Sequence, residues 1–229
     1  MIGSIFRVFY FIGLIVGLAI QVLHTRQSQQ NRITRDRKTG LDTLLTNLAS
    51  LGVLLPLIYV LSPWLDFADY RLPTWAGWVG AAVFVVALWL LWRSHADLGR
   101  NWWSSLEIRE GHTLVTQGAF RYIRHPMYAS YWLWGIAQAL LIQNWIAGLP
   151  GLVLLLPWYL LRVPREEQMM LEHFGEEYRL YINRTGRVIP LLWRQLATLR
   201  EAAGSDARSR MAKNFWNNDW DNGGYDSNL

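Results

Sequence analysis

The sequence contains no cysteine, and it is poor in charged residues. Without cysteine, disulfide bonds, thiolate metal ligands and a cysteine nucleophile are excluded. Only 17% of the residues are Asp, Glu, Lys or Arg, against roughly 25% in an ordinary soluble domain. No His-x-x-x-His pair indicates a metal site, and no glycine-rich loop follows a predicted strand. We therefore expect no metal and neither a P-loop nor a Rossmann nucleotide site.

Apolar residues, by contrast, are abundant and occur in long blocks. They make up 52% of the 229 residues, and Trp occurs 14 times. Trp favours the membrane–water interface, where its ring is buried and its N–H stays hydrated. A net charge of +5 can indicate nucleic-acid binding, but the basic residues here adjoin apolar blocks, which favours a role in membrane orientation. We predict an integral membrane protein whose partner is the lipid bilayer, not nucleic acid.

The apolar blocks predict an all-α membrane protein with about five transmembrane helices. A helix needs about 20 apolar residues to cross the hydrocarbon core of a bilayer. The two-residue polar turn Gln143-Asn144 makes the last two segments a helical hairpin, and Pro150 and Pro157 predict bends in its second arm. The five segments are 5–23, 41–61, 75–92, 126–142 and 145–161.

The distribution of Lys and Arg predicts the topology. Most of these residues lie in the polar regions 25–40, 93–125 and 162 onward, whereas the loop 62–72 contains only Arg71. Five spans place the three basic regions on one side, which the positive-inside rule makes cytoplasmic. The N-terminus is then outside and the C-terminus inside.

Three regions follow one another along the chain. Residues 1–92 form an N-terminal part with three spans. Residues 93–195 contain the helical hairpin and an amphipathic helix, the latter predicted from the helical spacing of Met170, Phe174, Tyr178 and Tyr181. Residues 196–229, rich in polar residues and glycine, are predicted to be disordered.

Polar residues that can carry chemistry gather at both ends of the predicted hairpin. The motif Arg124-His125-Pro126-Met127-Tyr128 precedes it, and Arg162, Glu166 and Glu167 follow it. Pro126 favours a helix start, which offers free N–H groups to an anionic ligand. Arg162, at the end of an apolar span, can bind a carboxylate through two hydrogen bonds. On these residues alone, ordinary structural roles stay open: arginines that anchor span ends, a capping histidine and solvated glutamates.

Several motifs in the second half of the chain match a known pattern. They are His112-Thr113-Leu114-Val115, Gly118, Arg124-His125-Pro126-Met127-Tyr128, Arg162, Glu166-Glu167, Phe174-Gly175-Glu176-Glu177-Tyr178 and Tyr181. Together they resemble the isoprenylcysteine carboxyl methyltransferases, integral membrane enzymes that use S-adenosylmethionine, and most closely the compact prokaryotic members. The resemblance covers about residues 93–190, which makes 93–195 the expected catalytic region.

The resemblance implies a cofactor pocket on the cytoplasmic side, formed by the C-terminal half of the chain. Arg162 would bind the substrate carboxylate and act in catalysis together with Glu166. Phe120 stands where the family often has Tyr, so a hydroxyl group is missing there. The residues implied for cofactor binding are Glu107, His112, Thr113, Leu114, Val115, Phe120, His125, Pro126, Met127, Tyr128, Glu166 and Glu167.

The function implied is methyl transfer from S-adenosylmethionine to the carboxylate of a lipophilic substrate such as a C-terminal prenylcysteine, with S-adenosylhomocysteine as product. A carboxylate is already ionised, so catalysis would rest on positioning and electrostatics, with Tyr128 stabilising the sulfonium by cation–π attraction.

Two other hypotheses remain. A phospholipid N-methyltransferase or a small-thiol S-methyltransferase of the same wider group would need a base such as His112 or His125. A membrane transporter or scaffold would bind no cofactor.

Overall fold

The computed structural model describes residues 2–28, 33–36, 40–99, 107–109 and 113–191. The predicted disordered region 196–229 and the site residue His112 lie outside the described residues. Of Glu107 only the backbone is described. The prediction of three regions along the chain therefore stays a prediction.

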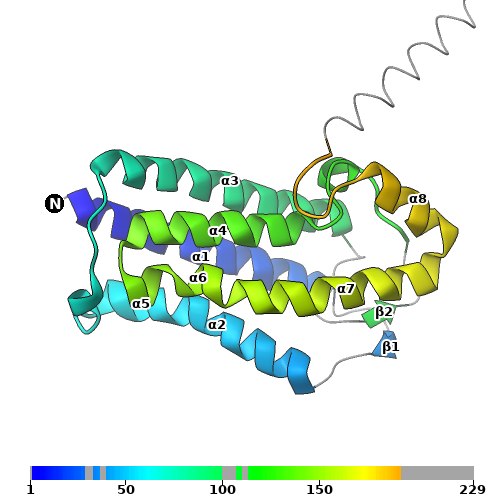
Figure 1. Cartoon of the computed structure of the whole chain (residues 1–229), viewed down its shortest axis with the longest axis horizontal. Coiled ribbons are helices and arrows are strands. Elements are labelled where there is room, and N and C mark those ends of the chain that lie inside the picture. Colours follow the sequence, from blue (N-terminus) through cyan, green and yellow to red (C-terminus); the bar gives the residue numbers. More distant parts are fainter. Residues whose placement is uncertain (1, 29–32, 37–39, 100–106, 110–112, 192–229) are drawn as a thin grey trace, which may run out of the picture. The chain divides into compact units, whose positions relative to one another are not determined.

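Five long helices lie alongside one another in Figure 1. Helix α3 packs along α4, and α1 contacts both of them, while α2 packs against α6 and α7. The long helices are α1 (Ile2–Ser28), α2 (Gly40–Leu61), α3 (Thr74–Leu98), α4 (Pro126–Ile142) and α7 (Leu155–Phe174). The shorter elements are β1 (Ile33–Asp36), η1 (Asp66–Ala68), β2 (Glu107–Arg109), η3 (Gly118–Arg121), α5 (Trp145–Gly148), α6 (Pro150–Val153) and α8 (Glu176–Arg184).

The predicted all-α membrane architecture is confirmed, with one small addition. Strands β1 and β2 form an antiparallel pair, although they are far apart in the sequence. Each has only three or four residues, too few for an alternating pattern to be recognised in the sequence.

In the described part of the chain, four helical segments are long and apolar enough to cross a membrane: Gly3–His24, Thr43–Leu61, Thr74–Leu98 and Trp145–Phe174, the last of which comprises α5, α6 and α7. Helix α4 has 17 residues, which at 1.5 Å per residue is about 25 Å and less than the roughly 30 Å of a bilayer core. The predicted count of five spans stays a prediction that depends on α4. Towards the two ends of α3, Trp75, Trp78, Trp89 and Trp92 are all exposed, as expected of tryptophans at a membrane–water interface.

Aromatic stacking and a buried amide hold the bundle together. The rings of Tyr10 and Phe84 stack at 5.2 Å, and the Trp134 ring meets Phe84 edge-on at 5.0 Å. Gln138 accepts a hydrogen bond from the Tyr10 hydroxyl at 2.8 Å and donates to the Gly52 carbonyl at 3.1 Å. Because these bonds join α1, α2 and α4, they fix the helices that surround the cavities described below.

The predicted hairpin turn is confirmed. Helix α4 ends at Ile142, Gln143 has a left-handed backbone (φ 49°), and the Asn144 side chain accepts hydrogen bonds from the first N–H groups of α5. The bend predicted at Pro150 is found, since α5 ends just before this residue and α6 begins at it, whereas no bend is found at Pro157. Pro157 lies in the first turn of α7 and does not interrupt it. The hairpin therefore returns α7 to the end of the bundle where α4 begins.

The predicted amphipathic helix over Met170–Tyr181 is in fact two helices. Gly175 has φ 55° and separates α7 from α8. A residue with positive φ cannot continue a right-handed helix, and glycine adopts this conformation at little cost. After the break, Tyr178 and Tyr181 on α8 are buried, and burial raises the pKa of both phenols.

Asp97, near the end of α3, positions the segment that leads to α4. Its carboxylate accepts a hydrogen bond from the Ala119 N–H at 2.7 Å and pairs with Arg93 at 2.8 Å. Gly118 approaches this carboxylate so closely that a Cβ there would lie 2.1 Å from Oδ2. Its φ of +61° also disfavours any other residue.

We expect Gly118→Ala to destabilise the protein by about 3 kcal/mol, because backbone strain of roughly 1–3 kcal/mol is added to a clash. The matched control is Gly99→Ala. Gly99 also has a positive φ, +50°, but among the described residues no atom lies within 4 Å of its Cβ position. Thermal unfolding in detergent should show a larger loss for Gly118→Ala. Equal losses would show that the contact with Asp97 does not matter.

Candidate active site

The motif Arg124–Tyr128 lies where the segment after η3 meets helix α4. The helix begins at Pro126, as predicted, and His125 is its N-cap residue. The backbone N–H groups of Arg124 and His125 donate to the carbonyl oxygens of Gly186 and Arg187, both at 2.8 Å. The start of α4 is thereby joined to the segment that follows α8.

Glu167 binds three cationic or polar side chains around this junction. Its Oε1 accepts hydrogen bonds from Arg124 Nε at 3.0 Å and from His125 Nε2 at 3.3 Å, and its Oε2 accepts one from Arg187 Nη2 at 2.7 Å. The carboxylate raises the pKa of Arg187. Glu167 is only 7% exposed, so these bonds join α7 to the start of α4 and to the segment after α8.

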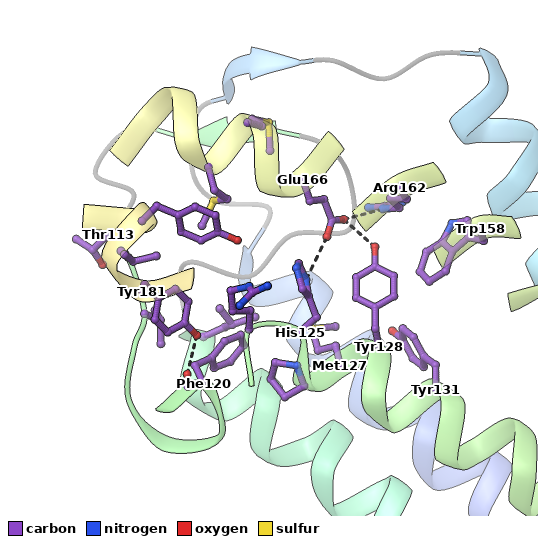
Figure 2. A pocket seen from close by; sticks show the side chains of 18 of the residues that line it. Thr113, Phe120, His125, Met127, Tyr128, Tyr131, Trp158, Arg162, Glu166 and Tyr181 are labelled. Carbon is purple, nitrogen blue, oxygen red and sulfur yellow. Dashed lines mark hydrogen bonds and ion pairs between the residues drawn. The ribbon is translucent and has the colours of Figure 1, made fainter. Parts of the chain in front are cut away.

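Glu166, the preceding residue, has different partners. Its carboxylate accepts a hydrogen bond from the Tyr128 hydroxyl and another from Arg162 Nε, both at 2.8 Å, and lies 3.8 Å from His125 Nδ1. Figure 2 shows Arg162, Tyr128 and His125 converging on Glu166. The imidazole of His125 thus lies between the two glutamates, with one ring nitrogen facing each.

Arg162 places a positive charge at the point where the apolar part of α7 ends. Its side chain is 9% exposed. Its guanidinium carbon lies 5.1 Å from the centre of the Trp158 ring, one helical turn earlier, within cation–π distance. A buried guanidinium held by a carboxylate and an aromatic ring is a rigid binding group for a second anion.

These side chains border a cavity of about 350 Å³, within the size range of small-molecule sites. Helices α4, α7 and α8 and the segments 113–115 and 118–121 contribute most of its lining. The predicted site residues that line it are Thr113, Leu114, Val115, Phe120, His125, Pro126, Met127, Tyr128, Arg162 and Glu166.

Three predicted cofactor residues are not among the lining that the structure describes. Glu167 is engaged with Arg124, His125 and Arg187 instead. His112 is outside the described residues, and the side chain of Glu107 is not described. Within the described ranges, no group of three or more His, Cys, Asp or Glu side chains could hold a metal ion.

The cavity also has aromatic residues that sequence reasoning missed. Tyr131 and Trp158 border it, and their rings lie 6.3 Å and 5.0 Å from that of Tyr128. Both residues could have been predicted from their spacing in the sequence. Tyr131 follows Tyr128 by three residues and Trp158 precedes Arg162 by four, so each pair shares a helix face. Phe120 is buried, and its carbonyl accepts a hydrogen bond from the Tyr181 hydroxyl at 2.6 Å.

A second cavity, of about 220 Å³, lies between α1, α2, α4 and α7. It shares four lining residues with the first cavity, namely Gln21, Thr46, Tyr131 and Trp158. The remaining lining is mostly apolar. The two cavities therefore adjoin, one with charged groups and one inside the helix bundle.

Comparison with known proteins gives consistent matches. Residues 78–172 match the family model described as the isoprenylcysteine carboxyl methyltransferase (ICMT) family. The chain is 24% identical over 151 residues to protein-S-isoprenylcysteine O-methyltransferase A of Arabidopsis thaliana, covering 65% of this chain and 77% of the relative. It is 25% identical over 183 residues to the Homo sapiens protein-S-isoprenylcysteine O-methyltransferase, covering 76% of this chain and 63% of the relative. A solved eukaryotic intramembrane Ras methyltransferase ICMT aligns with a TM-score of 0.44 and 24% identity, covering 68% of this chain and 54% of that one.

The matches confirm the predicted class, an integral membrane methyltransferase. They also confirm the resemblance to the isoprenylcysteine carboxyl methyltransferase family, whose pattern this chain carries in residues 78–172. That segment contains α4 and most of α7, and with them His125, Tyr128, Arg162 and Glu166.

Proposed function

We propose that this protein transfers a methyl group from S-adenosylmethionine to the carboxylate of a lipophilic acceptor, such as a C-terminal prenylcysteine. The observation that carries the proposal is the buried Arg162, bound to Glu166 in a cavity that adjoins a second, apolar one. The relatives are named protein-S-isoprenylcysteine O-methyltransferases, which supports this class of acceptor.

The first cavity fits the proposed cofactor in size and in chemistry. Glu166 offers carboxylate oxygens to an ammonium group or a ribose hydroxyl. The rings of Tyr128 and Tyr131 offer π faces to a sulfonium. Leu114 and Val115 supply apolar contact for a base. We assign these residues, with Thr113, Phe120, His125, Pro126 and Met127, to cofactor binding.

When bound, S-adenosylmethionine would supply an electrophilic methyl group, and its transfer to an acceptor carboxylate oxygen would give a methyl ester and S-adenosylhomocysteine without moving a proton. Arg162 binds and orients the carboxylate, and Glu166 holds the guanidinium in place. Tyr128 donates to Glu166 and so fixes the carboxylate against the aromatic rings. The buried position of Arg162 keeps these electrostatic interactions strong.

The acceptor's hydrocarbon chain is assigned to the second cavity, inside the bundle. In the proposed topology the N-terminus is outside, and the C-terminus and the site are cytoplasmic, as the basic regions favour. A soluble cofactor would then approach from the cytoplasm and the lipophilic acceptor from the bilayer, which accounts for a site at the boundary between them.

The test is an acceptor screen with the purified protein in lipid nanodiscs and methyl-labelled cofactor. A prenylcysteine carboxylate, a phospholipid amine and a small thiol are offered separately. We expect base-labile label, the mark of a methyl ester, only on the prenylcysteine. Transfer only to the amine or the thiol would replace the proposal by the N- or S-methyltransferase hypothesis. A failure to bind cofactor would favour the transporter or scaffold.

A further inference from the structure

Trp158 carries a buried hydrogen-bond donor that no described part of the fold uses. Its indole Nε1 has essentially no solvent exposure, and among the described residues no acceptor lies within hydrogen-bonding reach. Buried indole N–H groups usually have a partner, because an unmade hydrogen bond costs free energy. The partner is therefore to be sought in a molecule that occupies the adjoining cavities.

The position of this donor indicates what that molecule presents to it. Trp158 is one of the four residues that line both cavities. Its ring lies 5.1 Å from the Arg162 guanidinium carbon and 5.0 Å from the Tyr128 ring. Figure 2 shows Trp158 beside Tyr128, on the side of the site where Arg162 lies. A methyl acceptor whose hydrocarbon chain fills the second cavity, and whose carboxylate binds Arg162, would lie next to this indole.

We propose that Trp158 is a specificity-determining residue, whose indole N–H donates a hydrogen bond to one oxygen of the acceptor carboxylate while Arg162 balances its charge. The inference rests on the proposed function. An N–H group can only donate, so it suits a carboxylate oxygen and not the N–H groups of an ammonium. Trp158 and Arg162 are four residues apart on α7, so both project from the same face of the helix.

Holding one oxygen also leaves the other free to react. The oxygen bound by Trp158 becomes the carbonyl oxygen of the ester, which is still a hydrogen-bond acceptor. The second oxygen forms the new bond to the methyl carbon as the carbon–sulfur bond breaks and its electron pair stays on sulfur. Because the carboxylate charge disappears in this step, the hydrogen bond is stronger to the substrate than to the ester, and its loss should raise KM more than it lowers kcat.

The test is Trp158→Phe, which keeps an aromatic ring against Arg162 and replaces the indole, with its N–H donor, by a smaller phenyl ring; the matched Trp132→Phe control makes the same change of ring size. We expect KM for the prenylcysteine carboxylate to rise about tenfold, the usual effect of losing a hydrogen bond to a charged group. The affinity for S-adenosylmethionine and the unfolding temperature should stay at wild-type values. The matched control is Trp132→Phe, since Trp132 packs on Tyr159 at 5.9 Å and lines neither cavity. It should leave KM unchanged.

Three outcomes overturn the inference. An unchanged KM in Trp158→Phe shows that the indole N–H does not bind the acceptor. Equal losses of acceptor and cofactor affinity show a merely structural role. If the wild-type protein methylates no prenylcysteine carboxylate, the proposed function itself fails, and the wild-type assay alone reveals this.

A second measurement uses the wild-type protein, and so does not depend on the folding of the variant. The methyl ester product is compared as an inhibitor with the corresponding methyl ether, which lacks the carbonyl oxygen. We expect the ester to inhibit the wild-type protein more strongly than the ether does, because only the ester offers a carbonyl oxygen to the Trp158 N–H. Equal inhibition of the wild type by both compounds would overturn the inference.

Discussion

Replacing Arg162 by alanine should lower kcat/KM for a prenylcysteine carboxylate by two to three orders of magnitude. Removing one member of a buried, hydrogen-bonded charge pair costs about 2–5 kcal/mol, and every 1.4 kcal/mol or so is a factor of ten. The Arg162 side chain is only 9% exposed, so water cannot replace the guanidinium as the partner of a bound carboxylate. Steady-state assays in nanodiscs, with labelled cofactor, measure the effect.

Two variants show whether the effect of Arg162→Ala belongs to carboxylate recognition. Arg162→Lys keeps the charge but loses the planar pair of donors, so its activity should fall between those of the wild type and alanine. Arg179→Ala removes a largely exposed arginine of α8, which pairs with Glu176 at 3.7 Å, and should change activity little. Our assignment of Arg162 fails if Arg162→Ala keeps wild-type activity toward the carboxylate.

The meeting of the two polar clusters could be predicted from the sequence. Gln143-Asn144 interrupts an apolar stretch and indicates a hairpin, and the two ends of an antiparallel hairpin are close in space. The bonds from Tyr128 to Glu166 and from Arg124 to Glu167 confirm this. Pro126 likewise predicted the start of α4 correctly, because proline lacks the N–H that a first helical turn leaves unpaired.

Which residues of the two clusters line the cavity, and which only join the helices, could not be predicted from the sequence. Glu166 and Glu167 are adjacent, so their side chains point about 100° apart around α7, and the sequence does not say which direction faces the cavity. Tyr131 and Trp158 share helix faces with Tyr128 and Arg162, but aromatic residues at helical spacing more often form a core. Only the packing of α4 against α7 shows which of these side chains line the cavity and which pack in the core.

The two neighbouring glutamates should therefore respond in opposite ways to the same isosteric change. Glu166→Gln removes the charge of a cavity-lining side chain that is 22% exposed. We expect the dissociation constant for S-adenosylmethionine to rise at least tenfold, because a charge-assisted bond worth about 1.5–3 kcal/mol becomes a neutral one. Isothermal titration calorimetry measures this change. The loss of stability should be smaller than in Glu167→Gln, since the Glu166 side chain is 22% exposed and the Glu167 side chain only 9%.

Glu167→Gln should instead destabilise the protein by about 3 kcal/mol, because breaking a buried ion pair leaves an uncompensated charge. The Arg124 side chain is 8% exposed and would lose its only carboxylate partner among the described ion pairs. Unfolding in graded SDS measures the loss, and cofactor affinity measured well below the transition should stay near the wild-type value. If Glu167→Gln weakens cofactor binding and leaves stability intact, Glu167 contacts the cofactor, as the resemblance implies, and the division between the two glutamates is wrong.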